Sequence, residues 1–304
     1  MAAVHTNKYR QPDSARFQHL NEFEQKLVYQ VPHLLESYHY INKQSFVDAI
    51  RNAGDKVFLD SGAFSAYSLG VKIDLPTYCD YIIRNQDIIR VEDGVMMASV
   101  LDGIGDPLLT WQNQQRMEKL GAKPLPCFHA GEDERYLEHY VKNYEYITLG
   151  GMVGGSTKQL MIWLDRIWEN YLTDGSGRPR LKVHGFGITA IPLMERYPWY
   201  SCDSSSWIQS AAFGAVVTPD YGPIQVSDKS PSRHIRNQHL FSYDEPIRKR
   251  MYDMFESQGF DGDRLSTVYE SRAVYNLWAY GEINKQIDAV NDGTNFTGAI
   301  QELF

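Results

Sequence analysis

The chain has 304 residues and a formal net charge of −8, with 43% hydrophobic and 22% charged residues. This length fits one large domain or two small ones, and the composition is typical of a soluble globular protein. The negative charge argues against indiscriminate nucleic-acid binding, although a local basic patch remains compatible with it.

The sequence predicts a cytoplasmic protein without a membrane partner. No apolar run is long enough to cross a bilayer, and residues 1–16 are polar and lack the apolar centre of a signal peptide. The three cysteines, Cys79, Cys127 and Cys202, are widely spaced, which predicts neither a disulfide framework nor a cysteine-rich zinc site. We therefore expect no metal ion and no cofactor.

Strands and helices alternate along most of the chain. After an apolar stretch at 27–38 that predicts a strand or turn, we expect strands at 56–60, 94–101, 123–128, 146–149, 181–183, 199–202, 215–218 and 224–226. Between them we expect helices at 45–52, 75–85, 106–120, 132–143, 156–171, 190–195 and 206–213, with Asp74 and Asp106 at two helix starts.

About eight such units in series predict an α/β protein with parallel strands, and a closed (β/α)8 TIM barrel accounts for their number. A doubly wound open sheet is the alternative, but the sequence lacks the glycine-rich nucleotide-binding motifs that would favour it. After residue 242 the pattern changes to helices at 243–257 and 267–287. We expect a barrel domain at 1–242 and a helical extension at 243–304 that packs on it.

Polar residues follow the predicted strands at their carboxyl ends. In a parallel barrel these ends meet at one mouth, where active sites lie. The residues concerned are Asp60, Asp102, His129, His184 and Asp203, together with two glycine pairs and the aromatic Phe64. Asp60 and Asp203 are each followed by small hydroxyl residues, which suggests a two-carboxylate active site.

Four motifs resemble those of the tRNA-guanine transglycosylase superfamily, and they occur in the same order over residues 56–203. Asp60-Ser61-Gly62-Ala63-Phe64 is similar to its Asp-Ser-Gly-Gly-aromatic motif, and the run at 149–155 is similar to its Gly-Gly-Leu-Ala-Val-Gly-Glu loop. The run at 184–187 is similar to its Met-Gly-Val-Gly loop, and Asp203 stands in the place of its nucleophile.

Two departures point to one branch of that superfamily. No cysteine follows Cys202, so the zinc site of the tRNA enzymes is absent, and the chain is shorter than those enzymes. The chain is most similar to the phage-type DNA 7-deazaguanine transglycosylases, which exchange guanine in DNA for a base such as preQ0. A phage-encoded member would act in the bacterial host cytoplasm.

The resemblance implies a role for each residue of the site. Asp203 would attack C1′ of deoxyguanosine, Asp60 would act as general acid and base, and Asp102 would accept hydrogen bonds from the base edge. The partners implied are DNA with a flipped-out guanine and a free 7-deazaguanine base. The further substrate-binding residues implied are Ser61, Phe64, His129, Gly150, Gly151, Met152, His184 and Gly185, with Phe64 and His184 stacking on the base.

Other interpretations stay open. Each aspartate could cap a helix or turn, each histidine could be a core residue, and the glycine pairs could be tight turns. The stretch at 229–239 could contact DNA phosphates through Lys229, Arg233 and Arg236, or it could be a solvated loop. The substrate could be tRNA, and the chain could be a non-catalytic nucleic-acid-binding barrel.

Overall fold

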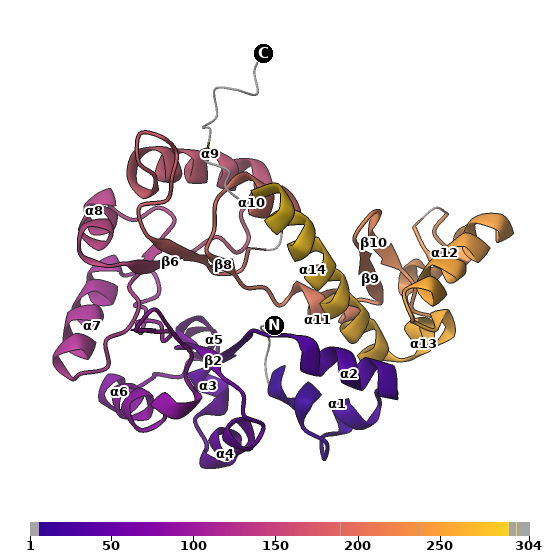
Figure 1. Ribbon diagram of the computed structural model, residues 1–304, viewed down its shortest axis with the longest axis horizontal. Coiled ribbons are helices and arrows are strands. Elements are labelled where there is room, and N and C mark those ends of the chain that lie inside the picture. The colour runs from indigo at the N-terminus through magenta and orange to yellow at the C-terminus, as the bar shows by residue number, and fades with distance from the viewer. Residues whose placement is uncertain (1–5, 189, 237, 292–295, 297–304) are drawn as a thin grey trace. The chain divides into compact units, whose positions relative to one another are not determined.

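The computed structural model describes residues 6–188, 190–236, 238–291 and 296 (Figure 1). The chain divides into two compact units, one of which contains His33–Ser204 and the other Thr6–Pro32 and Ser205–Asp288. Residues 205–242 thus belong to the same unit as the C-terminal helices, whereas the sequence pattern predicted a domain boundary after residue 242. Among the described residues, no helix is both long and apolar enough to cross a membrane.

The unit at His33–Ser204 is built on parallel strands. A four-stranded parallel sheet has the order β5-β6-β7-β8, and β1 pairs with β2, also in parallel. Isolated parallel bridges join Leu59 to Ala98 and Ser99 to Leu125, so parallel pairing continues between the two sheets. The strands are β1 (Leu34–Ser37), β2 (Val57–Asp60), β5 (Cys127–His129), β6 (Tyr146–Gly150), β7 (Lys182–Gly185) and β8 (Ser201–Cys202). The predicted α/β class is confirmed.

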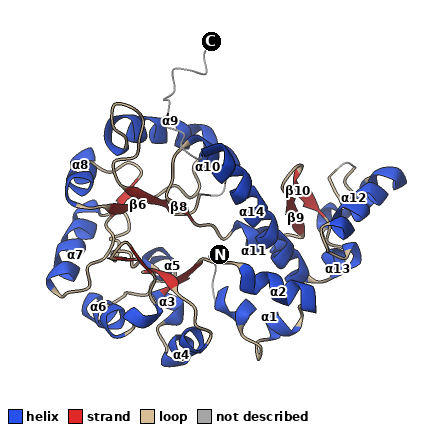
Figure 2. Cartoon of the chain, viewed as in Figure 1, coloured by secondary structure: helices blue, strands red, loops and turns tan. Residues whose placement is uncertain are grey.

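Helices alternate with these strands along the chain, and most of them lie on the outer side of the strands (Figures 1 and 2). They are α3 (Tyr38–Ile41), α4 (Gln44–Asn52), α5 (Ala63–Ser68), α6 (Leu75–Arg84), the 3₁₀ turn Gln86–Ile88, α7 (Pro107–Lys119), α8 (Glu134–Asn143), α9 (Thr157–Ile167), the π turn Trp168–Leu172 and α10 (Ile191–Arg196). The predicted N-caps are confirmed, since Asp74 accepts from the Thr77 amide and Asp106 from the Leu109 amide, each at 3.0 Å.

The strand predicted at 94–101 is wrong in extent. Regular β structure there is limited to a hairpin of β3 (Val91–Glu92) and β4 (Val95–Met96), whose turn uses positive φ at Asp93 and Gly94. The segment then changes partners: the Met97 amide donates to Arg90, while the Met97 carbonyl accepts from the Leu59 amide. Because one partner strand replaces the other within a few residues, no long ladder forms.

Alternation along the strands separates two faces of the sheet. One face is apolar and packs against the helices, with Phe128, Leu149 and Val183 in the same cluster as Leu164 and Trp168. At the amino ends of the strands the other face carries a second apolar cluster, which we call the apolar layer: Leu35, Phe58, Met97, Leu125 and Tyr146. Polar side chains follow this layer along the same face, toward the carboxyl ends.

The second unit is mostly helical. Its elements are the 3₁₀ turn Thr6–Arg10, α1 (Ala15–Gln18), α2 (Glu22–Gln30), α11 (Ser206–Ala212), the antiparallel pair β9 (Ala215–Thr218) and β10 (Gly222–Gln225), the 3₁₀ turns Pro231–His234 and Leu240–Ser242, α12 (Glu245–Ser257), α13 (Gly262–Thr267) and α14 (Tyr269–Asn291). The strand or turn predicted from residue 27 is wrong at its start, because α2 begins at a capping box between Asn21 and Glu24 and continues to Gln30. Buried Glu24 accepts from Arg264 and Ser271, which ties α2 to α13 and α14.

Candidate active site

Asp60 is the last residue of β2 and is held by two donors. Its Oδ2 accepts from the Ser37 hydroxyl at 2.7 Å and from the Gly62 amide at 3.0 Å. Burial raises the pKa of Asp60 to about 6 against the opposing effect of the Ser37 hydrogen bond, and the charges of Asp102 and Asp203 add to the increase. This carboxyl group therefore holds a proton at a higher pH than a free aspartate does.

The backbone after Asp60 requires glycine. Gly62 has φ +72°, and a Cβ atom there would lie 2.6 Å from Cβ of His39. This conformation turns the Gly62 amide back onto Asp60. Ser61 is buried and uses its polar groups internally, since its amide donates to the Ser99 hydroxyl at 2.9 Å and its hydroxyl accepts from the Ala63 amide at 3.3 Å. Phe64, on α5, is 65% exposed.

A line of hydrogen bonds leads to Asp203, and we call it the His184 chain: Tyr146, Ser201, His184 and Asp203. The Tyr146 and His184 side chains each lie 2.8 Å from the Ser201 hydroxyl, and His184 Nε2 lies 3.3 Å from Asp203 Oδ1. Because a carboxylate only accepts, Nε2 carries the proton, and Nδ1 accepts from Ser201. Burial raises the pKa of Tyr146, which keeps its hydroxyl available as the first donor.

Asp203 lies close enough to Asp60 for its charge to act on that carboxyl group. Its Oδ1 also accepts from the Gly187 amide at 3.1 Å, so this oxygen is engaged by two donors of the same unit. The ring of His184 lies 4.5 Å from that of Phe58, centroid to centroid, and Phe58 points to the same side of β2 as Asp60. The two carboxylates therefore converge from the carboxyl ends of β2 and β8.

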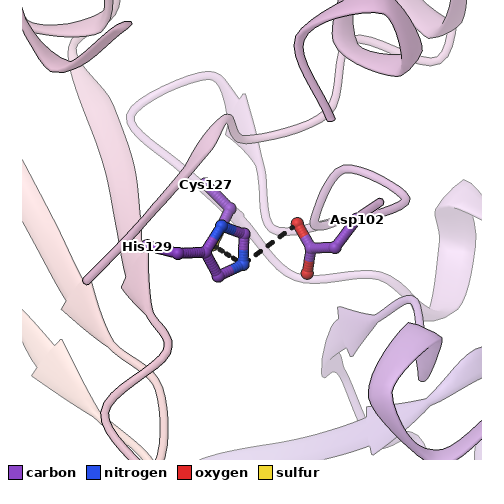
Figure 3. A group of neighbouring side chains, drawn as sticks. All are labelled: Asp102, Cys127 and His129. Carbon is purple, nitrogen blue, oxygen red and sulfur yellow. Dashed lines mark hydrogen bonds and ion pairs between the residues drawn. The ribbon is translucent and has the colours of Figure 1, made fainter. Parts of the chain in front are cut away.

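A second group, the His129 cluster, contains Asp102, Cys127, His129 and Glu132. His129 Nδ1 lies 2.8 Å from Glu132 Oε1. His129 Nε2 lies 3.4 Å from Cys127 Sγ and 3.6 Å from Asp102 Oδ1 (Figure 3). Asp102 Oδ1 is buried and makes no hydrogen bond to any described residue. Asp102 does not cap the helix that follows, because Asp106 does so.

The charges of the His129 cluster support one another. Burial opposes a charged imidazole, but Cys127, Asp102 and Glu132 outweigh it and raise the pKa of His129. Burial raises the pKa of the Cys127 thiol to about 11, against the opposing effect of the neighbouring His129.

Glycines bring β6 close to this cluster. Gly150 lies opposite His129 in the sheet, and a Cβ atom there would be 2.8 Å from His129 Cδ2 and 3.2 Å from Cys127 Sγ. Gly151 has φ +72° and packs against the backbone of Ala130. A Cβ atom at Gly185 would meet Ile188 at 2.8 Å, so this glycine serves close packing as well.

The structure brings together Asp60, Asp102, His129, Gly150, His184 and Asp203 at the carboxyl ends of the strands. It does not bring the Met152 side chain to them, because Met152 is buried in the cluster that faces the helices. His184 is 2% exposed, and its stacking on a base, like that of exposed Phe64, stays a prediction. Lys229, Arg233 and Arg236 are exposed in the other unit, where Arg233 lies over the ring of Phe241.

Sequence reasoning missed five residues of the site: Ser37, Cys127, Glu132, Tyr146 and Ser201. Two of them left a signal in the sequence, since Cys127 and His129 alternate on one strand and Glu132 follows three residues later. The comparison with known proteins adds no family, because no family model matches the chain and no curated protein matches it significantly.

Proposed function

We propose that this chain is a base-exchange transglycosylase that replaces guanine in DNA by a 7-deazaguanine such as preQ0. The observation that carries the proposal is the pair Asp60 and Asp203. They follow two strand ends, lie close enough for the charge of Asp203 to act on Asp60, and have different hydrogen-bond partners. Two carboxylates in different environments are the arrangement that base displacement needs, one as nucleophile and one as proton donor.

In the proposed reaction, Asp203 attacks C1′ of a deoxyguanosine while the bond from C1′ to the base breaks. His184 and Gly187 hold Oδ1 of Asp203, which leaves Oδ2 to form the new bond. Asp60, with a pKa of about 6, gives its proton to the departing guanine and later takes one from the incoming base. The product of the first step is a covalent glycosyl-aspartate, and the second step regenerates free Asp203.

The base would be read by Asp102. A guanine-type edge offers two neighbouring donors, its N1–H and its exocyclic amine, and a carboxylate can accept both. Asp102 Oδ1 is buried without a hydrogen bond, so it has acceptor capacity to offer. The close packing of Gly150 against His129 would let backbone amides approach the carbonyl of the base.

The finer architecture belongs to the same proposal. We infer that the parallel strands of His33–Ser204 form part of a closed (β/α)8 barrel. The parallel bridges at Ala98 and Ser99, which continue the pairing from β2 to the sheet of β5 to β8, support this inference. The apolar layer also supports it, because residues from β1, β2 and β6 pack there on one another as they would inside a barrel.

DNA rather than tRNA is the proposed polymer, because no cysteine follows Cys202. The target nucleotide must leave the helical stack before Asp203 can reach it. Exposed Lys229, Arg233 and Arg236 are proposed to contact backbone phosphates, in which case DNA affinity falls as salt rises.

The test is an exchange assay. The protein is incubated with labelled preQ0 and either guanine-containing duplex DNA or tRNA, and Asp203→Asn is run beside the wild type. We expect label in DNA with the wild type alone. Label only in tRNA would replace the DNA proposal by the tRNA alternative. Nucleic-acid binding without any label would identify a non-catalytic barrel, and label from Asp203→Asn would remove the proposed nucleophile.

A further inference from the structure

We propose that Asp102, Cys127 and His129 bind a divalent transition-metal ion of the zinc type. Each residue offers one donor atom, and these atoms lie within 4.8 Å of one another (Figure 3). The set differs from the cysteine-rich site whose absence the cysteine spacing predicted, because it needs one cysteine only. The proposal concerns binding and does not depend on the exchange reaction.

The distances in the cluster approach those of a tetrahedral site. With zinc bonds of about 2.0–2.3 Å, tetrahedral geometry separates nitrogen from oxygen by about 3.3 Å and sulfur from nitrogen by about 3.6 Å. The corresponding distances here are 3.6 Å from His129 Nε2 to Asp102 Oδ1 and 3.4 Å from His129 Nε2 to Cys127 Sγ. Two edges of the tetrahedron are therefore already close to the required length.

Glu132 orients the histidine as a metal ligand requires. Its Oε1 lies 2.8 Å from His129 Nδ1, and its Oε2 accepts from the His129 amide at 3.1 Å. A carboxylate that takes the Nδ1 proton fixes the ring and turns the Nε2 lone pair toward the metal, as in many zinc sites. In His129, that nitrogen is the one that faces both Cys127 and Asp102.

A metal ion would also resolve the unsatisfied acceptor in the cluster. Asp102 Oδ1 is buried without a hydrogen bond, and an ion would supply its missing partner. A divalent ion beside one carboxylate and one thiolate gives a neutral set, which lowers the cost of burying the charges. The thiol of Cys127 transfers its proton to solvent as the metal–sulfur bond forms.

The donor atoms select the type of metal. Sulfur and imidazole nitrogen favour zinc and its neighbours, whereas magnesium and calcium prefer sites made of oxygen alone. Three protein ligands leave a fourth tetrahedral position for water or a small ligand, which is the pattern of sites that take part in chemistry. The glycine at position 150 keeps the adjacent backbone free of a side chain that would strike His129 and Cys127.

The test is titration of the metal-free full-length protein with Co²⁺, followed by competition with Zn²⁺. We expect one Co²⁺ per chain with a thiolate-to-cobalt absorption band in the near ultraviolet, and Zn²⁺ should displace it. Cys127→Ser should lose the band, whereas Cys79→Ser, a matched change at another buried cysteine, should retain it. Glu132→Gln should weaken Co²⁺ binding about 10- to 100-fold, since it alters only the orienting group.

Three results would overturn the proposal. They are a failure to bind Co²⁺, a band that survives in Cys127→Ser, and an affinity unchanged by Glu132→Gln. The circular dichroism spectrum of each variant shows whether it is folded. If Cys127→Ser does not fold, Glu132→Gln decides the question, because its carboxamide has nearly the same shape and can accept only one of the two hydrogen bonds that Glu132 accepts from His129.

Discussion

His184 and His129 stand at the ends of strands separated only by β6, yet their surroundings differ. His184 has a hydroxyl on one nitrogen and a carboxylate on the other, so it links Ser201 to Asp203. His129 has a carboxylate on Nδ1 and both a thiol and a second carboxylate beside Nε2. The same side chain therefore positions a single acid in one case and joins several potential metal ligands in the other.

The difference shows that the surrounding side chains, rather than the residue type, determine what each histidine can do. In the His184 chain Tyr146 donates to Ser201, Ser201 donates to His184 and His184 donates to Asp203, so the chain delivers an ordered hydrogen bond to Asp203. In the His129 cluster acceptors outnumber donors, so the cluster attracts a proton, a cationic metal or the donor edge of a base. The following variants separate these two behaviours.

The largest effect is expected at the end of the His184 chain. Asp203→Asn removes the attacking carboxylate, so exchange should fall by at least about 10⁴-fold while the fold is retained. The measurement is incorporation of labelled base, together with trapping of a protein–DNA adduct. Asp80→Asn is the control, because Asp80 is an exposed helix residue paired with Arg84. A normal exchange rate in Asp203→Asn would show that Asp203, at the end of the His184 chain, has only a structural role.

Asp60→Asn tests the acid at the end of β2. The folded-state pKa of Asp60, about 6, lies above the usual aspartate value of 3.8, so its contribution to stability is present in acid and lost as the pH rises through 6. The variant should therefore exceed the wild type in unfolding free energy by up to about 3 kcal/mol near neutral pH and show no gain near about pH 3.5. Urea denaturation at both pH values measures this difference. An equal difference at both values would contradict the raised pKa.

Asp102→Asn tests the acceptors of the His129 cluster. Replacing one oxygen by an amide removes at least one charge-assisted bond of about 1.5–3 kcal/mol, so the KM for the incoming base should rise about 10- to 100-fold. DNA affinity should be unchanged, because the base edge alone is affected. Asp106→Ala is the contrast: loss of the α7 cap should cost about 1 kcal/mol of stability and leave the KM unaltered. If the two variants behave alike, Asp102 has a structural role.

The smallest effect is expected inside the His184 chain. Ser201→Ala removes a neutral hydrogen bond worth about 0.5–1.5 kcal/mol, so kcat should fall about 2- to 12-fold with no change in the KM of the base. Ser201→Thr keeps a hydroxyl and should recover most of the rate. A larger KM with an unchanged kcat would place Ser201 among the base contacts and separate it from Asp203.

The sequence allowed correct predictions for features that depend on a single strand or helix. The apolar run before Asp60 and the polar residues after it located a strand end, and Asp74 and Asp106 located two helix starts. These features depend on neighbours in the chain, so the residues themselves carry the signal. The same holds for Cys127 and His129, whose shared side of β5 could have been predicted from their spacing of two.

Contacts across the sheet could not be predicted in this way. Tyr146 and Ser201 are 55 residues apart, and their hydrogen bond depends on the registers of β6, β7 and β8. The long strand expected at 94–101 failed for a similar reason, because two different strands compete for the backbone of Met97. A sequence pattern describes one segment at a time, whereas partner choice belongs to the assembled fold.

In the proposed reaction, the apolar layer would affect the fate of a glycosylated Asp203. Phe58 precedes Asp60 on β2 and contacts His184, so the amino-terminal side of the site is filled by hydrocarbon. In the proposed reaction, this layer would block water from that side of the sugar. An incoming base bound beside the sugar would displace water that could hydrolyse the intermediate, so occupancy of the base position would decide between transfer and hydrolysis.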